Sequence, residues 1–561
     1  MSKVWNLRKY DKEEISRYCD KYKMPEILAK LLIARGVGIQ DVDKYINVSL
    51  DNLYDPFLMK DMEKTVERIL RAKENNEKVV IYGDYDVDGV TSITVLYSFL
   101  KELGINASYY LPDRMEEGYG LNKDALKRLK DKGYTLVVTV DCGISAVDEL
   151  DYANSIGLEV CITDHHECGK VLPKAYSIVN PKQEDCNYPF EMLAGVGVAF
   201  KVITALSIKL GLEKEAYLKY LDIVTVGTIA DIVPLLDENR IITKIGLEKI
   251  KETKNEGLKA LIRVAGIKNI DSISISFGIA PRINASGRMA DASVAVKLLL
   301  STSPMEANSL AELLDSQNKE RQAVEKKILE EVLEKIEKEK LYEKRSLVVS
   351  GYGWHQGVIG IVASKVAEKY VKPVILITYE DKLAKGSGRT PHGISLYDAL
   401  DKCKDVLVQF GGHELAAGVT LEKEKIDEFT EKFEKAVTEL EKKELEAIID
   451  IDSEIRKEDI LKGITRINEK ILPFGQKNPE PVYLYRNLKI ESLSTLKDDK
   501  HIKFRLKDGN FCIDAIGFSQ GNRRDELKLG DKIDVVGNLA INDFGREKAV
   551  QIILKDFKKV V

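Results

Sequence analysis

Three aspartates at alternate positions are the first residues in this sequence that could carry out chemistry. Asp84, Asp86 and Asp88 stand in the segment G-D-Y-D-V-D-G. Carboxylates this close together repel one another unless a cation offsets their charge, and hard oxygen ligands suit Mg²⁺ or Mn²⁺. The segment therefore indicates a divalent metal site, and the alternative is a solvated acidic turn.

Two later segments add residue types that bind metals. Asp141 follows one apolar, β-branched run, and Asp164-His165-His166 follows another. Adjacent histidines are unusual in a chain that has only six. A metal-binding imidazole is commonly oriented by a carboxylate behind it, so we expect His165 to be a ligand with Asp164 as its supporting group.

A fourth candidate is Asp231, which lies inside the apolar stretch 226–234. An aspartate in such surroundings is costly unless it is paired or binds a metal. The stretch is compatible with a strand or with a helix. The aspartate could equally be a helix cap or a salt-bridge partner.

A basic polar segment at 281–288 contains Arg282, Asn284 and Arg288. We expect a loop here. Guanidinium groups near a phosphate-cleaving metal centre usually hold phosphate, because they are planar and carry several donors. The alternative is an ordinary surface loop.

The elements that must position these residues follow from the hydrophobic pattern. Apolar runs alternate with helical segments, which predicts a parallel sheet with right-handed crossovers. Strands are expected at 79–81, 108–111, 135–140 and 158–163. Loops at the carboxyl edge of such a sheet are where ligands bind, so the acidic and imidazole groups stand at the expected place.

A second α/β lobe is predicted after a long, highly charged helix at 302–345. Three glycine-bearing segments follow at 353–357, 386–390 and 411–414, with a helix expected to begin at Ala416. Glycines beside His, Ser and Arg near a helix N-terminus can cradle phosphate. The lobe is therefore predicted to bind phosphates.

The C-terminal region reads as a small β-barrel of OB type. Lys503, Phe504 and Arg505 interleave charge and an aromatic ring, as in proteins that bind single strands, although the aromatics could also be core residues. Residues 451–561 hold 22 Lys and Arg against 18 Asp and Glu, a net +4, which leaves −9 for the first 450 residues. Short strands are expected at 483–490, 501–506, 511–518, 532–540 and 548–554.

Bulk properties narrow the class of protein. The chain has 561 residues, 44% apolar content and a net charge of −5, which fits a multidomain globular protein and argues against a nucleic-acid coat. No apolar run is long enough to span a membrane and the N-terminus lacks a signal-peptide core, so we expect a cytoplasmic protein. Seven scattered cysteines without a C-x-x-C argue against a disulfide framework or structural zinc.

Taken together, the motifs resemble the DHH phosphoesterases, whose name matches Asp164-His165-His166. Within that family, the single-strand-specific exonucleases are the most similar, through G-D-Y-D-V-D-G, G-W-H-Q-G-V-I-G and G-G-H-E-L-A-A-G. The resemblance runs from about residue 55 to the end. It implies an N-terminal helical segment (1–55), a DHH domain (56–301), a connecting helix (302–345), a DHHA1 domain (346–445) and an OB-fold (446–561).

The resemblance also implies an activity: 5′→3′ hydrolysis of single-stranded DNA to 5′-mononucleotides in recombination and repair, with two Mn²⁺ or Mg²⁺ ions. The implied metal ligands are Asp84, Asp86, Asp88, Asp141, His165 and Asp231. His166 would contact the scissile phosphate with Asp164 behind the site, and Arg282, Asn284 and Arg288 would hold the strand. The implied phosphate- and DNA-binding residues are Arg114, His355, Ser387, Arg389, Gly412, His413, Lys503, Phe504 and Arg505.

By resemblance alone, single-strand-binding protein and a recombination helicase are candidate partners. Two other functions stay open at this point. One is a DHH enzyme that cleaves very short RNAs or cyclic dinucleotides, against which the appended barrel counts. The other is a non-catalytic replication scaffold, against which the complete set of metal-binding positions counts.

Overall fold

The computed structural model describes residues 3–112, 117, 120–391, 393–440, 446–542 and 549–560. The chain divides into two compact units, which we call the larger and the smaller unit. The larger unit contains Lys3–Ala280, Val296–Ala307 and Ile448–Val561, and the smaller unit contains Pro281–Ala295 and Asn308–Ala447. Arg114 lies outside the described residues.

The larger unit is built on a five-stranded sheet with the order β3-β2-β4-β5-β6. Every neighbouring pair is parallel, which confirms the predicted α/β architecture. The chain starts at β2, goes to one side for β3 and returns to the other side for β4, so the strand order reverses between β2 and β4. The strands are β2 (Val79–Gly83), β3 (Ala107–Tyr110), β4 (Leu136–Val140), β5 (Glu159–Thr163) and β6 (Ser177–Val179).

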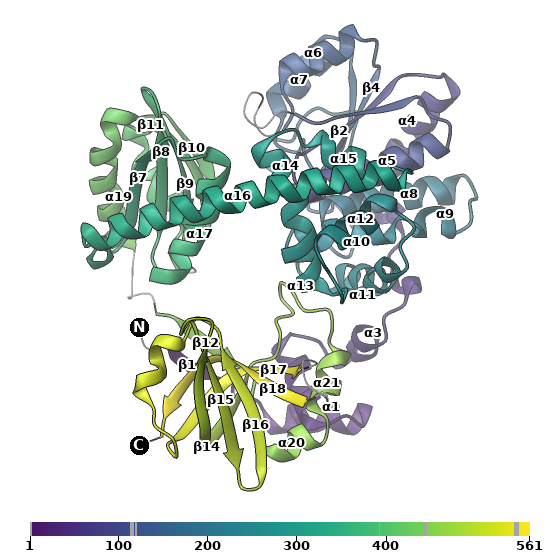
Figure 1. Cartoon of the computed structure of the whole chain (residues 1–561). Helices are drawn as coiled ribbons and strands as arrows, with labels where there is room; N and C mark the ends of the chain where they lie inside the picture. Colours follow the sequence, from purple (N-terminus) through teal and green to yellow (C-terminus); the bar gives the residue numbers. More distant parts are fainter. Residues whose placement is uncertain are drawn as a thin grey trace. The chain divides into compact units, whose positions relative to one another are not determined.

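Helices cover both faces of this sheet (Figure 1). Helices α6 (Lys123–Asp131) and α7 (Val147–Ser155) bury their apolar residues against one face. Helices α4 (Met62–Glu74), α5 (Val87–Glu102) and α8 (Gly195–Lys209) lie on the other side, where α5 and α8 pack together. Because both faces are covered, the strands β2 and β4 are buried along their whole length, as their continuous apolar runs predict.

The stretch around Asp231, left open between strand and helix, is the helix α10 (Leu221–Ala230). It packs between α5 and α11 (Asp237–Lys251), so its nearly continuous apolar sequence reflects burial on all sides rather than a strand. Helices α9 (Glu215–Leu218), α12 (Glu256–Val264) and α13 (Ser272–Ser274) complete this part of the unit.

The first residues depart from the predicted all-helical segment. Helices α1 (Lys12–Tyr22), α2 (Glu26–Ala34) and α3 (Val42–Ile46) are present, but they follow a strand, β1 (Val4–Leu7). Strand β1 pairs in parallel with β12 (Ile448–Ile451). Its partner lies more than 400 residues further along the chain, so no local pattern could have indicated the pairing.

The C-terminal region is the predicted barrel. Strand β14 pairs with both β15 and β17, and this closes five strands into a barrel that β13 extends. Phe504 is fully buried in the barrel core and lies edge-on against Phe557, which contradicts its predicted role as a DNA-stacking residue. The elements are β13 (Ser453–Ile455), α20 (Lys457–Leu461), α21 (Ile464–Lys470), β14 (Tyr483–Leu496), β15 (His501–Asp508), β16 (Phe511–Gly517), β17 (Lys532–Asn542) and β18 (Ala549–Lys559).

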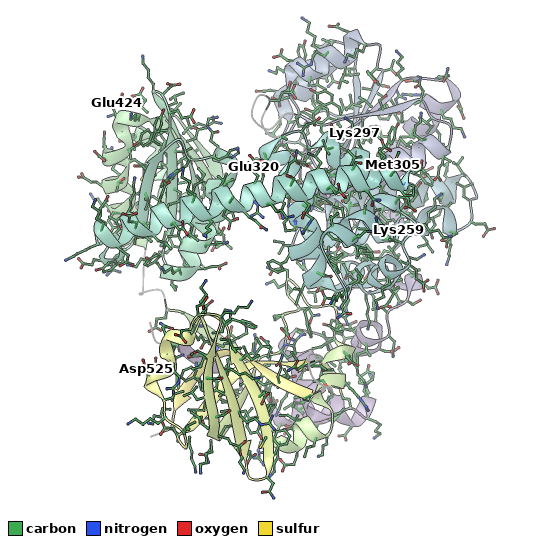
Figure 2. The ribbon with its side chains drawn as sticks, in the orientation of Figure 1. Lys259, Lys297, Met305, Glu320, Glu424 and Asp525 are labelled. Carbon is green, nitrogen blue, oxygen red and sulfur yellow. The ribbon has the colours of Figure 1, made fainter. Side chains whose placement is uncertain are left out.

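The smaller unit is a second α/β structure, with the sheet order β10-β11-β9-β8-β7. The long helix α16 (Pro304–Lys338) begins in the larger unit and continues into this one, and charged side chains such as Glu320 point away from it into solvent (Figure 2). The other elements are α14 (Ala280–Met289), β7 (Leu347–Tyr352), α17 (Gln356–Tyr370), β8 (Val374–Tyr379), β9 (Leu383–Arg389), α18 (Leu396–Asp401), β10 (Gln409–Gly412), β11 (Ala416–Glu422) and α19 (Ile426–Leu440). The helix α15 (Ser293–Leu300) is divided between the two units after Ala295.

Two local predictions for this unit are wrong. The segment 281–288 is not a loop, because it forms most of the helix α14. The small-residue segment from Ala416 is not a helix but the strand β11, which pairs with β10 and β9. Ala and Gly are compatible with either state, and here the flanking strands of the sheet decide it.

One buried arginine joins three parts of the larger unit. The side chain of Arg240, on α11, is 1% exposed and donates hydrogen bonds to the carbonyl oxygens of Tyr45 (2.8 Å), Ile471 (3.0 Å) and Lys470 (3.3 Å). Its guanidinium also lies 3.9 Å from the centre of the Tyr45 ring. Arg240 therefore fixes the N-terminal helices and the start of the barrel region onto the body of the unit.

We expect Arg240→Met to destabilise the protein by about 3 kcal/mol, because three buried carbonyl groups lose a charged donor. The measurement is the shift of the denaturant midpoint. Arg466→Met, at an exposed position on α21, is the control and should stay within about 0.5 kcal/mol of the wild type. Equal midpoints for the two variants would show that Arg240 does not hold these parts together.

Candidate metal centre

Carboxylates and imidazoles from four segments converge at the carboxyl edge of the larger unit's sheet. The strands β2, β4 and β5 end directly before Asp84, Asp141 and Asp164, and the reversal of strand order lies at the same edge. Potential ligand atoms lie within 4.8 Å of one another in three groups: Asp84, Asp86 and Asp141; Asp88, His165 and Asp231; and Asp141, His165 and His166. All six predicted ligands are thus brought together.

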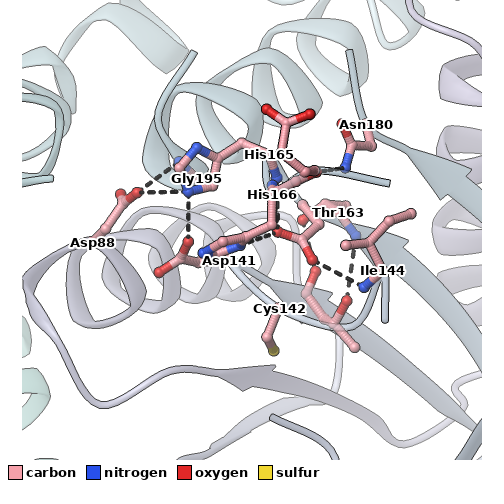
Figure 3. A network of polar contacts seen from close by, with 12 residues as sticks. Asp88, Asp141, Cys142, Ile144, Thr163, His165, His166, Asn180 and Gly195 are labelled. Atoms are coloured by element: carbon pink, nitrogen blue, oxygen red, sulfur yellow. Dashed lines mark hydrogen bonds and ion pairs between the residues drawn. The ribbon is translucent and has the colours of Figure 1, made fainter. Parts of the chain in front are cut away.

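The acidic loop is held by backbone groups of two helices. Asp86 caps the N-terminus of α5, where its carboxylate accepts hydrogen bonds from the backbone N–H groups of Asp88 and Gly89. Asp88 accepts from the backbone N–H groups of Gly195 (2.6 Å) and Val196 (2.8 Å) at the start of α8 (Figure 3). These amides supply hydrogen bonds to the carboxylate oxygens of Asp86 and Asp88. They fix the orientation of each carboxylate without neutralising its charge.

The approach of α8 to the cluster requires a glycine. A Cβ atom at Gly195 would lie 2.6 Å from the carboxylate of Asp141. Asp141 itself has a φ of 59°, in the left-handed region that few residues other than glycine adopt. Close packing and a strained backbone at the same point are typical of functional sites, and here they aim Asp141 at His165.

His165 presents one ring nitrogen to the carboxylates. Its Nε2 lies 3.1 Å from Asp141, 3.6 Å from Asp231 and 3.8 Å from Asp88. This buried nitrogen makes no hydrogen bond to any described residue, whereas the ring does bond the backbone of Leu193. A ring anchored on one side with three carboxylates around the other nitrogen has the arrangement that a metal ligand needs.

Asp164 supports a different histidine from the one predicted. Its carboxylate lies 2.7 Å from Nδ1 of His166, not beside the ring of His165. It also accepts from the backbone N–H groups of His165 and Ile144 (Figure 3). Asn180 is fully buried and donates to the His166 carbonyl at 3.0 Å. His166 is therefore oriented by two buried groups, of which sequence reasoning missed Asn180.

The electrostatics of the cluster call for a cation. Burial, and then the Asp86 charge, raise the pKa of Asp88 to about 7, and burial followed by the charge of Asp88 raises the pKa of both Asp141 and Asp231. Burial, and then the charge of His166, lower the pKa of His165 to about 4. A divalent ion would stabilise the charged carboxylates and bind the neutral imidazole, so the donor set fits Mn²⁺ or Mg²⁺.

His166 behaves differently from its neighbour. Burial alone would lower its pKa, but the hydrogen bond to Asp164 and the nearby carboxylates outweigh burial and raise it. The pKa of Asp164 is lowered, because the bond to His166 and the His166 charge outweigh the effect of burial. The pair thus favours a carboxylate beside a protonated imidazole, which is a hydrogen-bond donor suited to phosphate.

The other predicted strand-holding residues belong to the smaller unit. Arg282 pairs with Asp315 at 2.7 Å, and Arg288 donates to the carbonyl of Gly357 at 2.9 Å. Asn284 is half-buried on the same helix, α14. Their proposed action at the metal centre stays a prediction, since the cluster lies in the larger unit.

Within the smaller unit, three of the predicted phosphate-binding residues lie at the first turns of α17. His355 caps this helix through Nδ1, which accepts from the Gly357 N–H at 3.1 Å. A Cβ atom at Gly360 would lie 2.9 Å from the Ser387 Oγ and 3.1 Å from Nη2 of Arg389, so β9 packs closely on the first turns of α17. His413 follows β10 at the turn into β11. A helix N-terminus beside an arginine and a serine is suited to bind phosphate.

On the barrel, the basic residues around Phe504 face outward. Lys503 and Arg505 alternate with the buried Phe504 along β15, and Arg505 pairs with Asp514 at 2.8 Å. The alternation of the strand explains why only the two charged neighbours remain accessible.

The fold and the cluster are those of a DHH phosphoesterase, and family profiles agree. The profile of the DHH family N-terminal domain matches residues 78–228, and that of the DHHA1 domain matches residues 343–439. The profile of the RecJ OB domain matches residues 451–556.

Among the described residues, every helix is too short or too polar to cross a membrane.

Relatives and solved structures narrow the class. The single-stranded-DNA-specific exonuclease RecJ of Bacillus subtilis (strain 168) is 38% identical over 560 residues, which is 98% of this chain and 70% of that protein. RecJ from Thermus thermophilus in complex with Mn²⁺ has a TM-score of 0.86 at 28% identity, over 100% of this chain and 80% of that one. RecJ from the same organism in complex with Mg²⁺ has a TM-score of 0.80 at 25% identity, over 100% of this chain and 79% of that one. This chain belongs to the RecJ family.

The raised pKa of Asp88 predicts how pH affects the metal-free protein. Between the ordinary value of 3.8 and about 7, the folded chain holds a proton that the unfolded chain releases, so this group lowers stability as pH rises through that window. An asparagine cannot titrate. The stability of Asp88→Asn relative to the wild type should therefore increase by roughly 2–4 kcal/mol from pH 4 to pH 7.5.

Denaturant curves in EDTA at several pH values measure this change. The substitution also removes one of the two oxygens that accept hydrogen bonds from the α8 amides, which changes the stability at every pH. The test therefore uses only the slope of the unfolding free energy against pH. Asp148→Asn, at an exposed position in the first turn of α7, is the control and should run parallel to the wild type. If Asp88→Asn is also parallel, Asp88 titrates normally.

Proposed function

We propose that this chain is a metal-dependent exonuclease that degrades single-stranded DNA from the 5′ end and releases 5′-mononucleotides in recombination and repair. The observation that carries the proposal is the buried cluster of carboxylates and imidazole at the sheet edge, in a chain of the RecJ family. A cyclic-dinucleotide phosphodiesterase or a scaffold has no comparable support.

Asp84, Asp86, Asp88, Asp141, His165 and Asp231 would hold the metal ions. When bound, two divalent ions supply Lewis acidity and a water of lowered pKa. His166 would donate a hydrogen bond to the scissile phosphate from the nitrogen that Asp164 does not occupy, which stabilises developing negative charge. Asp164 orients this ring, and its hydrogen bond raises the pKa of His166, which favours the protonated form.

The smaller unit would hold the DNA backbone. The N-terminus of α17 offers a positive dipole end, and His355, Ser387 and Arg389 stand around it. Arg282, Asn284 and Arg288 on α14, with Gly412 and His413 after β10, would add contacts to phosphates. We also propose that the N-terminal segment, the DHH domain, the connecting helix and the DHHA1 domain end at about residues 55, 301, 345 and 445.

The barrel would bind the strand without doing chemistry, through outward-facing Lys503 and Arg505. We further propose that the protein acts in the cytoplasm, together with single-strand-binding protein and a recombination helicase. Membership of the family is the only support for this part.

The test is an end-labelling assay with Mn²⁺. Single-stranded DNA labelled at the 5′ or the 3′ end, duplex DNA and a cyclic dinucleotide are offered separately. The proposal expects immediate release of the 5′ label as a mononucleotide from single strands, with little attack on the duplex. Release from the 3′ end, or a preference for the cyclic dinucleotide, would contradict it.

Asp141→Ala should reduce Mn²⁺-dependent cleavage to well below a tenth of the wild-type rate, because Asp141 belongs to two of the three ligand groups. The variant should stay folded and, in EDTA, match or slightly exceed the wild-type Tm, since repulsion is relieved. Mn²⁺ should raise the Tm of the wild type more than that of the variant. Asp124→Ala, exposed on α6, is the control. Cleavage above a tenth of the wild-type rate would refute the assignment.

Arg389 is the residue that we propose to read the terminal 5′ phosphate. Burial lowers the pKa of its guanidinium, and Ser387 lies 3.1 Å away, so a phosphate would gain a partly desolvated partner. Arg389→Ala should slow cleavage mainly of 5′-phosphorylated DNA and shrink its advantage over 5′-hydroxyl DNA. Arg389→Lys should rescue poorly, because an ammonium cannot form two parallel bonds. The rate ratio for the two ends is measured at one fixed salt concentration, and an equal effect on both ends would make Arg389 a general backbone contact.

A further inference from the structure

Two exposed apolar side chains stand directly beside residues of the metal centre. Ile232 is 69% exposed and follows Asp231, and Met192 is 41% exposed and precedes Leu193, whose backbone bonds the ring of His165. Neighbouring residues lie about 3.8 Å apart along the chain, so the Ile232 side chain starts within a few ångströms of the Asp231 backbone. The Met192 side chain starts equally close to Leu193, whose backbone bonds the His165 ring. We call these two residues the apolar rim.

The two segments of the apolar rim are tied together. Asn239, on α11, is fully buried, and its side-chain Nδ2 donates to the carbonyl oxygens of both Met192 and Pro234. A single donor atom that reaches both segments holds them close to each other. The rim is therefore a fixed feature beside the metal centre and not two unrelated surface residues.

Ile232 has an unfavourable backbone as well as an exposed side chain. Its φ is 59°, and it stands just after α10 and the cap residue Asp231, where glycine or asparagine is usual. A β-branched residue in this conformation is a genuine outlier. Strain combined with solvent exposure brings no stability, which is typical of a residue kept for contact with a ligand.

We propose that the apolar rim contacts the nucleobase of the nucleotide whose phosphate lies at the metal centre. This inference rests on the proposed function and identifies how the same site holds the rest of its substrate. The rim carries no charge, so it suits the flat face of a base and not a phosphate. Apolar contact with a base face does not depend on its hydrogen-bonding groups, as expected of a nuclease that degrades any sequence.

The experiment compares variants on two substrates. Ile232→Asn and Met192→Gln remove the apolar character, and Asn suits the left-handed backbone at 232. The substrates are 5′-phosphorylated single strands that differ only in whether the first two nucleotides carry bases or are abasic. Measured are kcat/KM with Mn²⁺, the Kd by fluorescence anisotropy in EDTA, and the Tm in EDTA.

The control is Val371→Asn, at the end of α17. Val371 is also β-branched with a left-handed φ of 54°, but it belongs to the smaller unit and to no proposed site. It relieves the same kind of strain. Its kcat/KM on both substrates should equal that of the wild type.

For Ile232→Asn we expect a Tm about 1–2 °C above the wild type, since strain and apolar exposure are both removed. On DNA with bases, kcat/KM should fall about 5- to 30-fold, in the lower part of the range for loss of one contact to a base. On abasic DNA it should change less than about twofold, because the contact is already missing there. Met192→Gln should show the same dependence on the base.

An equal loss on both substrates, or no loss on either, would overturn the inference. So would a lower Tm for Ile232→Asn, because the rim would then pack against another part of the chain. If the wild type releases no nucleotides at all, the proposed hydrolysis fails. Binding in EDTA then decides the inference alone: it stands if Ile232→Asn weakens binding only of the strand that carries bases, and it falls otherwise.

Discussion

Charge repulsion between buried carboxylates is the constraint on which the rest of this structure depends. Asp84, Asp88 and Asp141 are each at most 5% exposed and stand within a few ångströms of one another or of Asp231. Their desolvation and mutual repulsion oppose ionisation, which is why the pKa of Asp88 rises to about 7. Ionised carboxylates at this spacing need a fold that holds them rigidly, and a divalent cation would offset their charge.

Backbone amides fix two carboxylates of the cluster. Two amides at the start of α8 receive Asp88, and Asp86 caps α5. Backbone amides fix the carboxylates without neutralising them, so their charge remains available to a metal. The two histidines are also held by hydrogen bonds. Asp164 orients His166, while a backbone group bonds the His165 ring and leaves its Nε2 facing the carboxylates.

The sequence predicted which residues could carry out the chemistry more accurately than it predicted how those residues are oriented. The alternating aspartates and the adjacent histidines predicted the ligands, and strand-like runs predicted the sheet edge where they meet. The histidine partner of Asp164 was wrong, because the two rings are adjacent in sequence and only the direction of the turn decides which one faces the carboxylate. Phe504 was assigned to the DNA because composition does not tell which face of a barrel strand points inward.

By itself, the sequence predicted the strands β2, β3, β4 and β5 of the larger unit's sheet, the five-stranded barrel, and the acidic and imidazole residues that converge at the sheet edge. These depend on periodicity and on residue types that act at short range along the chain. Only the tertiary structure decided that β1 pairs with β12, that Arg240 joins three distant segments, and that Ile232 is strained and exposed beside Asp231. Each of these depends on contacts between residues far apart in sequence or on a backbone angle that packing imposes, and neither leaves a local pattern to read.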